Sequence, residues 1–323
     1  MYHMNPFAPT GTNPISTLTS IFERCKGAYS EKTLSGYRSD LENFIAWCDD
    51  HGHEWVPAEP ATVARFIDEQ IEALSISTVK RRVEAIKFAH RMFDLPSPAS
   101  SSEVRLAIRR AARARPSRPK QSLGLTSDLL RPMLAACPDS LAGRRDAALI
   151  SVGYDTLCRS VELAAVRVEH LAPDLATILI PRAKSDPFGE GRIAHLSPST
   201  REHLAQWLEV SGIEEGPLFQ GLHTRKLRGK HLETASIRRI IKRAAARADL
   251  GEKAAGLSGH SMRIGAAQDM MVAGIDQVAI MQAGGWKTIS VLGRYVENAS
   301  TRAIHEHRWS RLALNNIQSN LSV

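Results

Sequence analysis

Residue types that can bind or attack a phosphate group occur in several short stretches after residue 150. A guanidinium group offers a planar fork of N–H donors that matches two phosphoryl oxygens. Imidazole and indole rings add further donors, and a tyrosine hydroxyl becomes a nucleophile once it loses its proton. The residues that stand out by type and spacing are Arg159 with Glu162 three positions later, Lys184, His260 with Arg263 three positions later, Trp286 after two glycines, and Tyr295 nine positions after Trp286.

Each of these features, taken alone, also has a structural explanation. Arg159 and Glu162 have the spacing of a helical ion pair. His260 and Arg263 share one helix face, which fits the first turn of a helix as readily as a site. The tryptophan and the tyrosine that follow are residue types that usually pack in or near a core. Their significance therefore depends on their combination and order.

In this combination and order, the stretches resemble the tyrosine recombinase (phage integrase) family. The resemblance rests on residues 154–162 (YDTLCRSVE), 258–267 (SGHSMRIGAA) and 280–286 (IMQAGGW), and it extends over most of the chain. Many relatives carry His at the position of Trp286. By position, the resemblance implies a catalytic set made of Arg159, Lys184, His260, Arg263, Trp286 and Tyr295, with Glu162 as the acidic residue that accompanies the first arginine.

The resemblance implies cleavage of a DNA strand by attack of a tyrosine on a phosphodiester, which leaves a 3′-phosphotyrosine and a free 5′-hydroxyl. Arg159 and Arg263 would bind the non-bridging oxygens, and His260 and Trp286 would add donors. Because an ordinary tyrosine has a pKa of about 10, Tyr295 needs cationic neighbours or a base, a role that His260 could fill. The phosphotyrosine bond keeps the energy of the broken phosphodiester, so we expect no cofactor.

Two of these assignments have rivals in the sequence. Lys184, expected on a hairpin, would protonate the 5′-oxygen leaving group, and Lys226 and Lys230 are weaker candidates for the same role. Tyr295 is favoured as the nucleophile because it follows the Gly-Gly-Trp segment. None of the other tyrosines does so: Tyr2, Tyr29, Tyr37 and Tyr154.

The elements that must position these residues can be read from hydrophobic spacing. About five helices are expected before residue 115, with Ser30, Ser77 and Ser101 or Ser102 at their starts. Alternating apolar residues at 176–180 and 193–196 flank a turn-rich segment, which predicts a β-hairpin. The helices expected after the basic segment are 127–137, 141–157, 199–211, 234–248, 260–273 and 276–283.

This pattern predicts a mainly α fold with a small β-hairpin or sheet in the second of two domains. With the resemblance, it implies the two-domain architecture of a tyrosine recombinase. We expect a helical core-DNA-binding domain at 1–115, a basic linker at 116–122, and a mixed α/β catalytic domain at 123–323 with a C-terminal tail helix.

Basic residues are concentrated in three segments. Residues 105–120 contain seven basic residues and no acidic one, which favours phosphate contact because surface faces usually mix charges. A solvated helix face followed by a tether is the alternative. Helices 77–93 and 234–248 are candidate groove-binding helices. The predicted DNA-binding residues are Lys80, Arg81, Arg82, Arg109, Arg110, Arg113, Arg115, Arg238, Arg239, Lys242 and Arg243.

Composition supports a polyanionic partner. The 42 Lys and Arg residues exceed the 34 Asp and Glu residues, so the net charge is +8, and the pI is near 9.5. We expect no membrane-spanning helix, because no apolar run reaches about 18 residues, and no secretory signal. The four cysteines and twelve histidines lack zinc spacing, so we predict reduced thiols, no metal and a cytoplasmic location. The resemblance implies a bacterial nucleoid, plasmid or phage context.

The resemblance implies a site-specific DNA recombinase that works through a Holliday junction. Its two domains would clamp double-stranded DNA at sites with inverted repeats, and two such sites require a homotetramer. Residues 301–314 are expected to form an amphipathic tail helix that docks on a neighbouring protomer or on its own domain. The alternatives are a type IB topoisomerase-like relaxer, which would need no paired sites, and a non-catalytic repressor, which the apparently complete catalytic set opposes.

Overall fold

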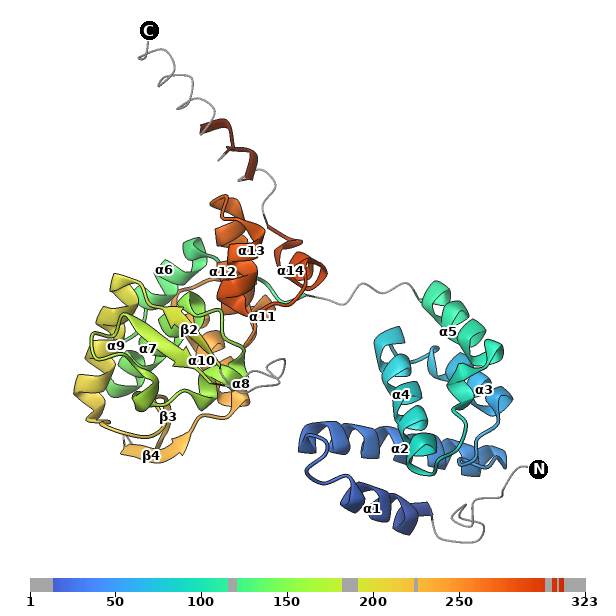
Figure 1. Ribbon diagram of the computed structural model, residues 1–323. Coiled ribbons are helices and arrows are strands. Elements are labelled where there is room, and N and C mark those ends of the chain that lie inside the picture. The colour runs from blue at the N-terminus through green and yellow to red at the C-terminus, as the bar shows by residue number, and fades with distance from the viewer. Residues whose placement is uncertain are drawn as a thin grey trace. The chain divides into compact units, whose positions relative to one another are not determined.

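The computed structural model describes residues 14–115, 121–181, 191–223, 226–299, 304–306 and 308–310 (Figure 1). The chain divides into two compact units, which we call the N-terminal unit (1–120) and the C-terminal unit (121–323). Each unit has its own hydrophobic core, so each is described by itself.

The described part of the N-terminal unit is helical. Ser30 begins one helix as expected, since its hydroxyl accepts a hydrogen bond from the backbone N–H of Thr33. The prediction that Ser77 opens the fourth helix is wrong by two residues, because Ser75 has the extended backbone and caps Thr78. The elements are α1 (Pro14–Arg24), α2 (Glu31–His51), α3 (Pro60–Gln70), α4 (Ile76–Met92), the 3₁₀ turn η1 (Pro98–Ser100) and α5 (Ser102–Ala114).

The core of the N-terminal unit lies between α2, α3, α4 and α5. Phe44 and Phe66 are fully buried and pack edge to face, with ring centroids 4.9 Å apart. The buried His90 on α4 fixes the loop before α3, since its Nε2 accepts the backbone N–H of Ala58 at 2.9 Å. Its Nδ1 contacts the carbonyl of Ile86, so both ring nitrogens are used inside the fold.

The C-terminal unit combines helices with two small hairpins. The helix α7 runs through its centre, and ten of its residues are buried. The elements are α6 (Ser127–Ala135), α7 (Leu141–Asp155), α8 (Ser160–Ala165), η2 (Val168–His170), β1 (Thr177–Ile180), β2 (Arg192–His195), α9 (Pro198–Ser211), β3 (Gln220–His223), β4 (Lys226–His231), α10 (Thr234–Arg247), α11 (Lys253–Gly256), α12 (Ser261–Val272), α13 (Gln277–Gly284) and α14 (Ile289–Val296).

The hairpin predicted from alternation is present as the antiparallel pair β1–β2, in which Ile180 pairs with Arg192. The second antiparallel pair, β3–β4, was not predicted. Its strands are polar and mostly exposed, so they lack the alternation that marks a half-buried strand. The prediction of a mainly α fold with a small β component in the second unit is confirmed.

A second, smaller apolar cluster lies at one end of the C-terminal unit. It is built on α12, which packs against α7, α13 and α14. Its buried members include Leu157, Ala267, Ile280 and Leu292. In the part of the chain that the structure describes, no helix has the length and apolar character needed to cross a membrane. Of the expected tail helix at 301–314, residues 304–306 and 308–310 are described, and both segments are helical.

Candidate active site

The structure brings together five of the predicted site residues at the small apolar cluster. Arg159 follows α7, His260 and Arg263 begin α12, Trp286 follows α13, and Tyr295 lies on α14. The carbon of the Arg263 guanidinium is 3.9 Å from the centroid of the Trp286 ring and 5.2 Å from that of Tyr295. The Trp286 and Tyr295 rings pack edge to face at 4.8 Å. Residues separated by more than a hundred positions therefore share one site.

Arg263 lies at the centre of this site and is fully buried. Its Nη1 donates to the carbonyls of Leu157 and Gly284, the latter at 2.7 Å. Its Nε and Nη2 have no hydrogen-bond partner within the described residues, and no carboxylate there forms an ion pair with it. Burial and the nearby Arg159 lower the pKa of Arg263 to about 10, so it stays charged at neutral pH.

Arg159 is held at the edge of the site by Glu162. Its Nη1 donates to Glu162 Oε1 at 2.5 Å, and its backbone N–H donates to the other carboxylate oxygen at 3.0 Å. The Glu162 side chain is only 2% exposed, while Arg159 is 24% exposed. The ion pair and the site role are therefore compatible, because the buried carboxylate orients a guanidinium that still reaches the surface.

His260 is exposed at the start of α12. Desolvation of the ring and the positive charges of Arg263 and Arg159 lower its pKa. The imidazole is therefore neutral at pH 7 and able to accept a proton.

The position of Trp286 depends on the two glycines before it. A Cβ on Gly284 would lie 2.0 Å from a carbon of the Trp286 ring, and Gly285 adopts the left-handed conformation with φ of 67°. The ring is 5% exposed, and its Nε1 has no hydrogen-bond partner among the described residues. A buried indole N–H without a partner is uncommon in a folded protein.

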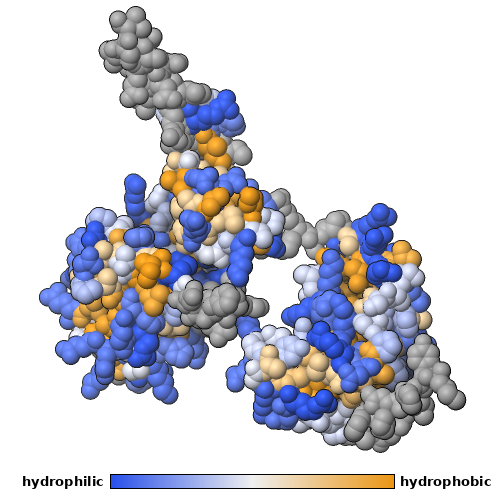
Figure 2. All heavy atoms as spheres, viewed as in Figure 1, coloured by the Kyte–Doolittle hydropathy of each residue, from blue (hydrophilic) through white to orange (hydrophobic). Residues whose placement is uncertain are grey.

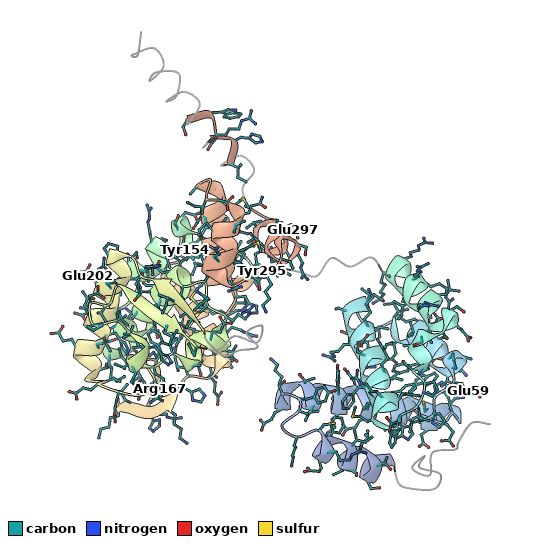
Figure 3. The ribbon with its side chains drawn as sticks, viewed as in Figure 1. Glu59, Tyr154, Arg167, Glu202, Tyr295 and Glu297 are labelled. Carbon is teal, nitrogen blue, oxygen red and sulfur yellow. The ribbon has the colours of Figure 1, made fainter. Side chains whose placement is uncertain are left out.

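Tyr154 and Tyr295 both lie against α12 but in different environments (Figure 3). The Tyr154 hydroxyl donates to Asp269 on α12, and burial raises the pKa of this tyrosine well above its usual value. Tyr295 is half-buried beside Arg263, and its backbone carbonyl accepts from Gln268 at 3.4 Å. The hydroxyl of Tyr154, one of the predicted rivals of Tyr295, is thus already hydrogen-bonded to a carboxylate, which disfavours it as a nucleophile.

Unpartnered donors are concentrated at this site. Among the described residues, eight buried side-chain N or O atoms lack a hydrogen-bond partner, and four of them belong to Arg263, Trp286 and Arg192. All four are N–H groups. Folded proteins rarely leave buried donors unpaired, so the site is suited to an anion that supplies the missing acceptors. Arg192, at the start of β2, was not predicted, because a single arginine in a strand carries no recognisable spacing.

Lys184 lies outside the described residues. Its two rivals, Lys226 and Lys230, are exposed on β4 and belong to the β3–β4 hairpin rather than to β1–β2. Lys184 therefore stays a prediction.

The basic residues predicted in the N-terminal unit differ in their availability. Lys80 is exposed, whereas Arg81 makes a bidentate contact with the buried Asp40, at 2.8 and 2.9 Å. The Arg82 side chain is 14% exposed and lies between Gln70 and Asp40, so it is the least available of the three for phosphate contact.

On α5, the basic residues form one largely exposed face. Arg110 pairs with Asp68, and Arg115 donates to the backbone carbonyl of Glu72. Arg109 and Arg113 are exposed. The ion pair of Arg110 and the hydrogen bond of Arg115 both lie at the surface. Such exposed contacts are weak, so a polyanion can compete for these two side chains.

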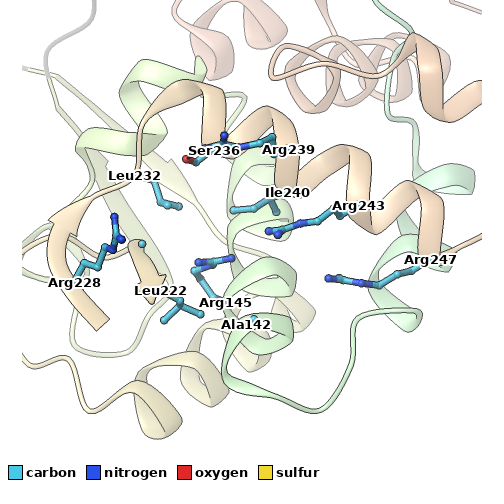
Figure 4. Close-up of a pocket in the computed structure, with 11 residues that line it drawn as sticks. Ala142, Arg145, Leu222, Arg228, Leu232, Ser236, Arg239, Ile240, Arg243 and Arg247 are labelled. Carbon is cyan, nitrogen blue, oxygen red and sulfur yellow. Dashed lines mark hydrogen bonds between the residues drawn. The ribbon is translucent and has the colours of Figure 1, made fainter. Parts of the chain in front are cut away.

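A basic pocket of about 390 Å³ lies between α10, α7 and the β3–β4 hairpin (Figure 4). Of the predicted DNA-binding residues on α10, Arg239 and Arg243 line it, whereas Arg238 and Lys242 do not. Three lining arginines were absent from the prediction: Arg145, Arg228 and Arg247. Arg145 and Arg228 come from α7 and β4, so no sequence spacing could have joined them to α10. Arg247 lies on α10 itself, four positions after Arg243, on the helix whose basic face the sequence indicates.

Beneath the pocket lies Asp146, whose side chain is fully buried. Its Oδ1 accepts from Arg145 at 2.6 Å, and its Oδ2 is 3.6 Å from Arg247 and 4.0 Å from Arg243. One carboxylate thus faces three guanidinium groups, and the pocket keeps an excess of positive charge.

Comparison with known protein families agrees with this geometry. Residues 124–302 match the model of the phage integrase family, and residues 24–92 match the phage integrase N-terminal SAM-like domain. The chain belongs to the phage integrase family, the tyrosine recombinases. The first match lies within the C-terminal unit, which contains the clustered site, and the second lies within the N-terminal unit.

Individual members of the family give the same result. The recombinase cre of Escherichia phage P1 is 30% identical over 302 residues, which cover 85% of this chain and 86% of that protein. An integrase/recombinase xerD homolog of Selenomonas ruminantium is 28% identical, covering 86% and 84%.

Solved structures with the same fold include two DNA complexes. One is the XerH site-specific recombinase bound to a palindromic difH substrate, with a TM-score of 0.63, 17% identity, and coverage of 89% of this chain and 82% of that chain. The other is a lambda integrase dimer bound to a COC′ core site, with a TM-score of 0.59, 15% identity, and coverage of 90% and 79%.

Proposed function

We propose that this member of the phage integrase family is a site-specific DNA recombinase whose Tyr295 attacks a DNA phosphodiester. One observation carries the proposal: the buried N–H donors of Arg263 and Trp286 lack partners and lie beside a half-buried tyrosine. A phosphate placed against this tyrosine supplies acceptors that the fold itself does not provide. The site is therefore complementary to a phosphate flanked by a phenol nucleophile.

The reaction exchanges one phosphoester bond for another. The Tyr295 hydroxyl gives up its proton, and its oxygen forms a bond to phosphorus. The bond from phosphorus to the 5′-oxygen breaks, and that oxygen takes up a proton to become a free hydroxyl. Attack by a 5′-hydroxyl of a second DNA strand reverses these steps, releases Tyr295 and creates the Holliday junction. Because the covalent bond keeps the phosphodiester energy, no cofactor is consumed.

The neighbouring side chains have distinct roles in this step. Arg263, Arg159 and Trp286 donate hydrogen bonds to the non-bridging oxygens, where negative charge grows in the transition state. Each well-placed donor of this kind is worth about 2.7–4 kcal/mol. The neutral imidazole of His260 accepts the tyrosine proton. Lys184 protonates the departing 5′-oxygen.

We assign DNA binding to both units. In the C-terminal unit, the arginines around the α10 pocket neutralise backbone phosphates (Figure 4). In the N-terminal unit, the basic face of α5 and the start of α4 do the same, with 1–115 as the core-binding domain and 116–122 as the linker. The solved complexes of XerH and lambda integrase with DNA support this assignment. Phosphate neutralisation makes the affinity fall steeply with salt.

Recombination exchanges strands between two sites, so we propose a homotetramer on DNA with inverted-repeat arms. The C-terminal unit exposes apolar side chains near α13 and α14, namely Ile275, Val278 and Ile289. Figure 2 shows apolar atoms at the surface of this region. Contact with another protomer would remove that surface from water.

Covalent capture from a random DNA pool tests the proposal and selects the target sequence in the same experiment. The probe is a pool of short duplexes in which randomised arms flank a nicked central segment, so that the cleaved fragment diffuses away. Wild-type protein should form an adduct that survives SDS, and the captured DNA should converge on one sequence. Tyr295→Phe should bind that sequence and form no adduct, whereas Tyr154→Phe, the matched control, should still form it. An adduct with Tyr295→Phe removes this residue as the nucleophile.

The same captured duplex separates the two alternatives. A topoisomerase-like relaxer would relax a supercoiled plasmid that lacks the captured site, whereas a recombinase requires two copies of it. A non-catalytic repressor would bind a preferred DNA sequence, selected by gel shift, yet form no SDS-stable adduct. Failure of the wild-type protein to form any adduct would therefore overturn the proposal.

A further inference from the structure

We propose that Arg192 is a positioning residue for strand cleavage, because it holds the turn that presents Arg159 to the scissile phosphate. The inference rests on the function proposed above. Arg192 is the first residue of β2, where it pairs with Ile180 at the end of β1. It follows the 182–190 segment that contains Lys184. It thus stands where the hairpin meets the site.

The turn between α7 and Arg159 is held by two guanidinium groups. Arg192 Nη2 donates to the carbonyl of Thr156 at 2.5 Å and lies 3.9 Å from the Cys158 sulfur. Arg263 Nη1 donates to the carbonyl of Leu157 in the same turn. Leu157 has a positive φ of 52°, a conformation that costs a non-glycine residue energy and needs support from its surroundings.

Arg192 also contacts the segment that presents Trp286. Its Cδ and Nε lie 3.5 Å from the place that a Cβ on Gly285 would occupy. Arg192 is therefore packed between the turn before Arg159 and the residue before Trp286. The stem provides the contact with Gly285, whereas the guanidinium provides the hydrogen bond to the turn before Arg159.

Stability alone does not explain a guanidinium at this position. Arg192 Nη1 is buried and has no hydrogen-bond partner among the described residues. Leaving a buried donor unpaired is unfavourable, and an apolar side chain of similar length would avoid this cost. The Cys158 thiol beside it is also buried, with its pKa raised to about 11, so it is neutral and gives Arg192 no counter-charge. What the guanidinium contributes is the bond to the turn.

Rates of adduct formation on the captured duplex test this role. We expect Arg192→Gln to slow single-turnover cleavage roughly 10- to 100-fold, as displacement of a catalytic group by about 1 Å does. DNA affinity should stay within about twofold of wild type, because phosphate contacts elsewhere dominate it. Arg167→Gln is the matched control, since Arg167 is an exposed arginine of the same unit paired with Glu169, and it should cleave at the wild-type rate (Figure 3).

A double-mutant cycle separates positioning from a general structural effect. If Arg192 acts through Arg159, adding Arg192→Gln to an Arg159→Lys protein should lower the cleavage rate no more than about twofold further. If the double variant loses cleavage rate by the product of the two single-variant losses, the two residues act independently and the inference is overturned. A wild-type cleavage rate for Arg192→Gln overturns it as well. Loss of cleavage in proportion to a lowered unfolding temperature and weaker DNA binding overturns it as well.

If Arg192→Gln does not fold, Arg192→Lys carries the same comparison, because it keeps the stem and charge but loses the second N–H arm. If the wild-type protein forms no adduct, the proposed function itself fails. If the wild-type protein forms the adduct and the Arg192 variant forms it at the same rate, only this inference fails.

Discussion

Replacing Arg263 with methionine should abolish strand cleavage while leaving the stability of the fold nearly unchanged. The methionine stem fills the space of the arginine stem and removes the charge. In the folded protein, Arg263 has two N–H groups without partners and two bonds to carbonyls. These two features act in opposite directions on stability.

Both effects arise from hydrogen-bonding groups buried around Arg263. Removing the two unpaired donors recovers about 1–3 kcal/mol each, or about 2–6 kcal/mol in total. Leaving the carbonyls of Leu157 and Gly284 without their donor costs about the same amount. The two effects have opposite signs and similar size, so we expect a small net change in the free energy of unfolding; each 1 kcal/mol of it corresponds to about 2–4 °C in Tm for a unit of this size. Cleavage loses two donors to the phosphate and should fall by roughly 10⁴-fold.

Arg145→Met is the matched control, because Arg145 is also a buried arginine of the C-terminal unit. All of its N–H arms are engaged, with Asp146 and with the carbonyl of Gln220. Its loss leaves the fully buried Asp146 with only longer contacts, which costs about 3 kcal/mol or more. We expect Arg145→Met to unfold about 6–12 °C below wild type.

Thermal unfolding followed by circular dichroism, together with adduct formation on the captured duplex, measures both quantities. If Arg263→Met unfolded at as low a temperature as Arg145→Met, Arg263 would serve the fold rather than cleavage. If Arg263→Met retained more than about a hundredth of wild-type cleavage, its donors would not be the ones that stabilise the transition state.

Three further outcomes are expected. Because the pKa of His260 is lowered and the neutral ring is the acceptor, the single-turnover rate constant for cleavage should be constant above about pH 6.5 and fall only below it. A rate that already falls between pH 8 and pH 7 would contradict this. Gly284→Ala should displace the Trp286 ring and cut cleavage at least tenfold at unchanged DNA affinity, whereas Gly293→Ala on α14, where a Cβ meets nothing within 4 Å, should have no effect in the same assay. Burial lowers the pKa of His90, so its contribution to stability is fully present above about pH 6.5 and declines as the pH falls below that value. Denaturant unfolding of the N-terminal helices should therefore show a lower free energy of unfolding at pH 5 than at pH 7.5. His90→Gln should make this difference smaller.

Much of the helical framework could be predicted from local signals. Hydrophobic spacing and serine caps identify α2 and α5, and alternation identifies β1–β2. The same signals failed for β3–β4, whose polar and exposed strands carry no alternation. They also failed for α14, which local patterning marks only as a segment flanking Tyr295. The β-branched residues Ile289 and Val291 and the internal Gly293 weaken the local preference of this segment for helix, and its contacts with α12 make up for that weakness.

The residues of the candidate site likewise fall into those that the sequence identified and those that only the structure revealed. The residues that the motifs carry, such as Arg159 and Arg263, could be named from the sequence because each motif occupies a few consecutive positions. Arg192 could not, since its importance comes from a contact with the carbonyl of Thr156, 36 positions earlier in the chain. Arg145 and Arg228 joined the α10 pocket only through packing of α7 and β4 beside α10.

By itself, the sequence determined which chemical groups are present, their order along the chain, and the amphipathic helices that carry them, since these depend on neighbouring residues. Only the tertiary structure decided which donors have no partner. Whether the N–H groups of Arg263 and Trp286 find acceptors depends on backbone carbonyls and rings brought together from α7, α12, α13 and α14. That balance of paired and unpaired donors is a property of packing in three dimensions, and it is what suits the site to a phosphate.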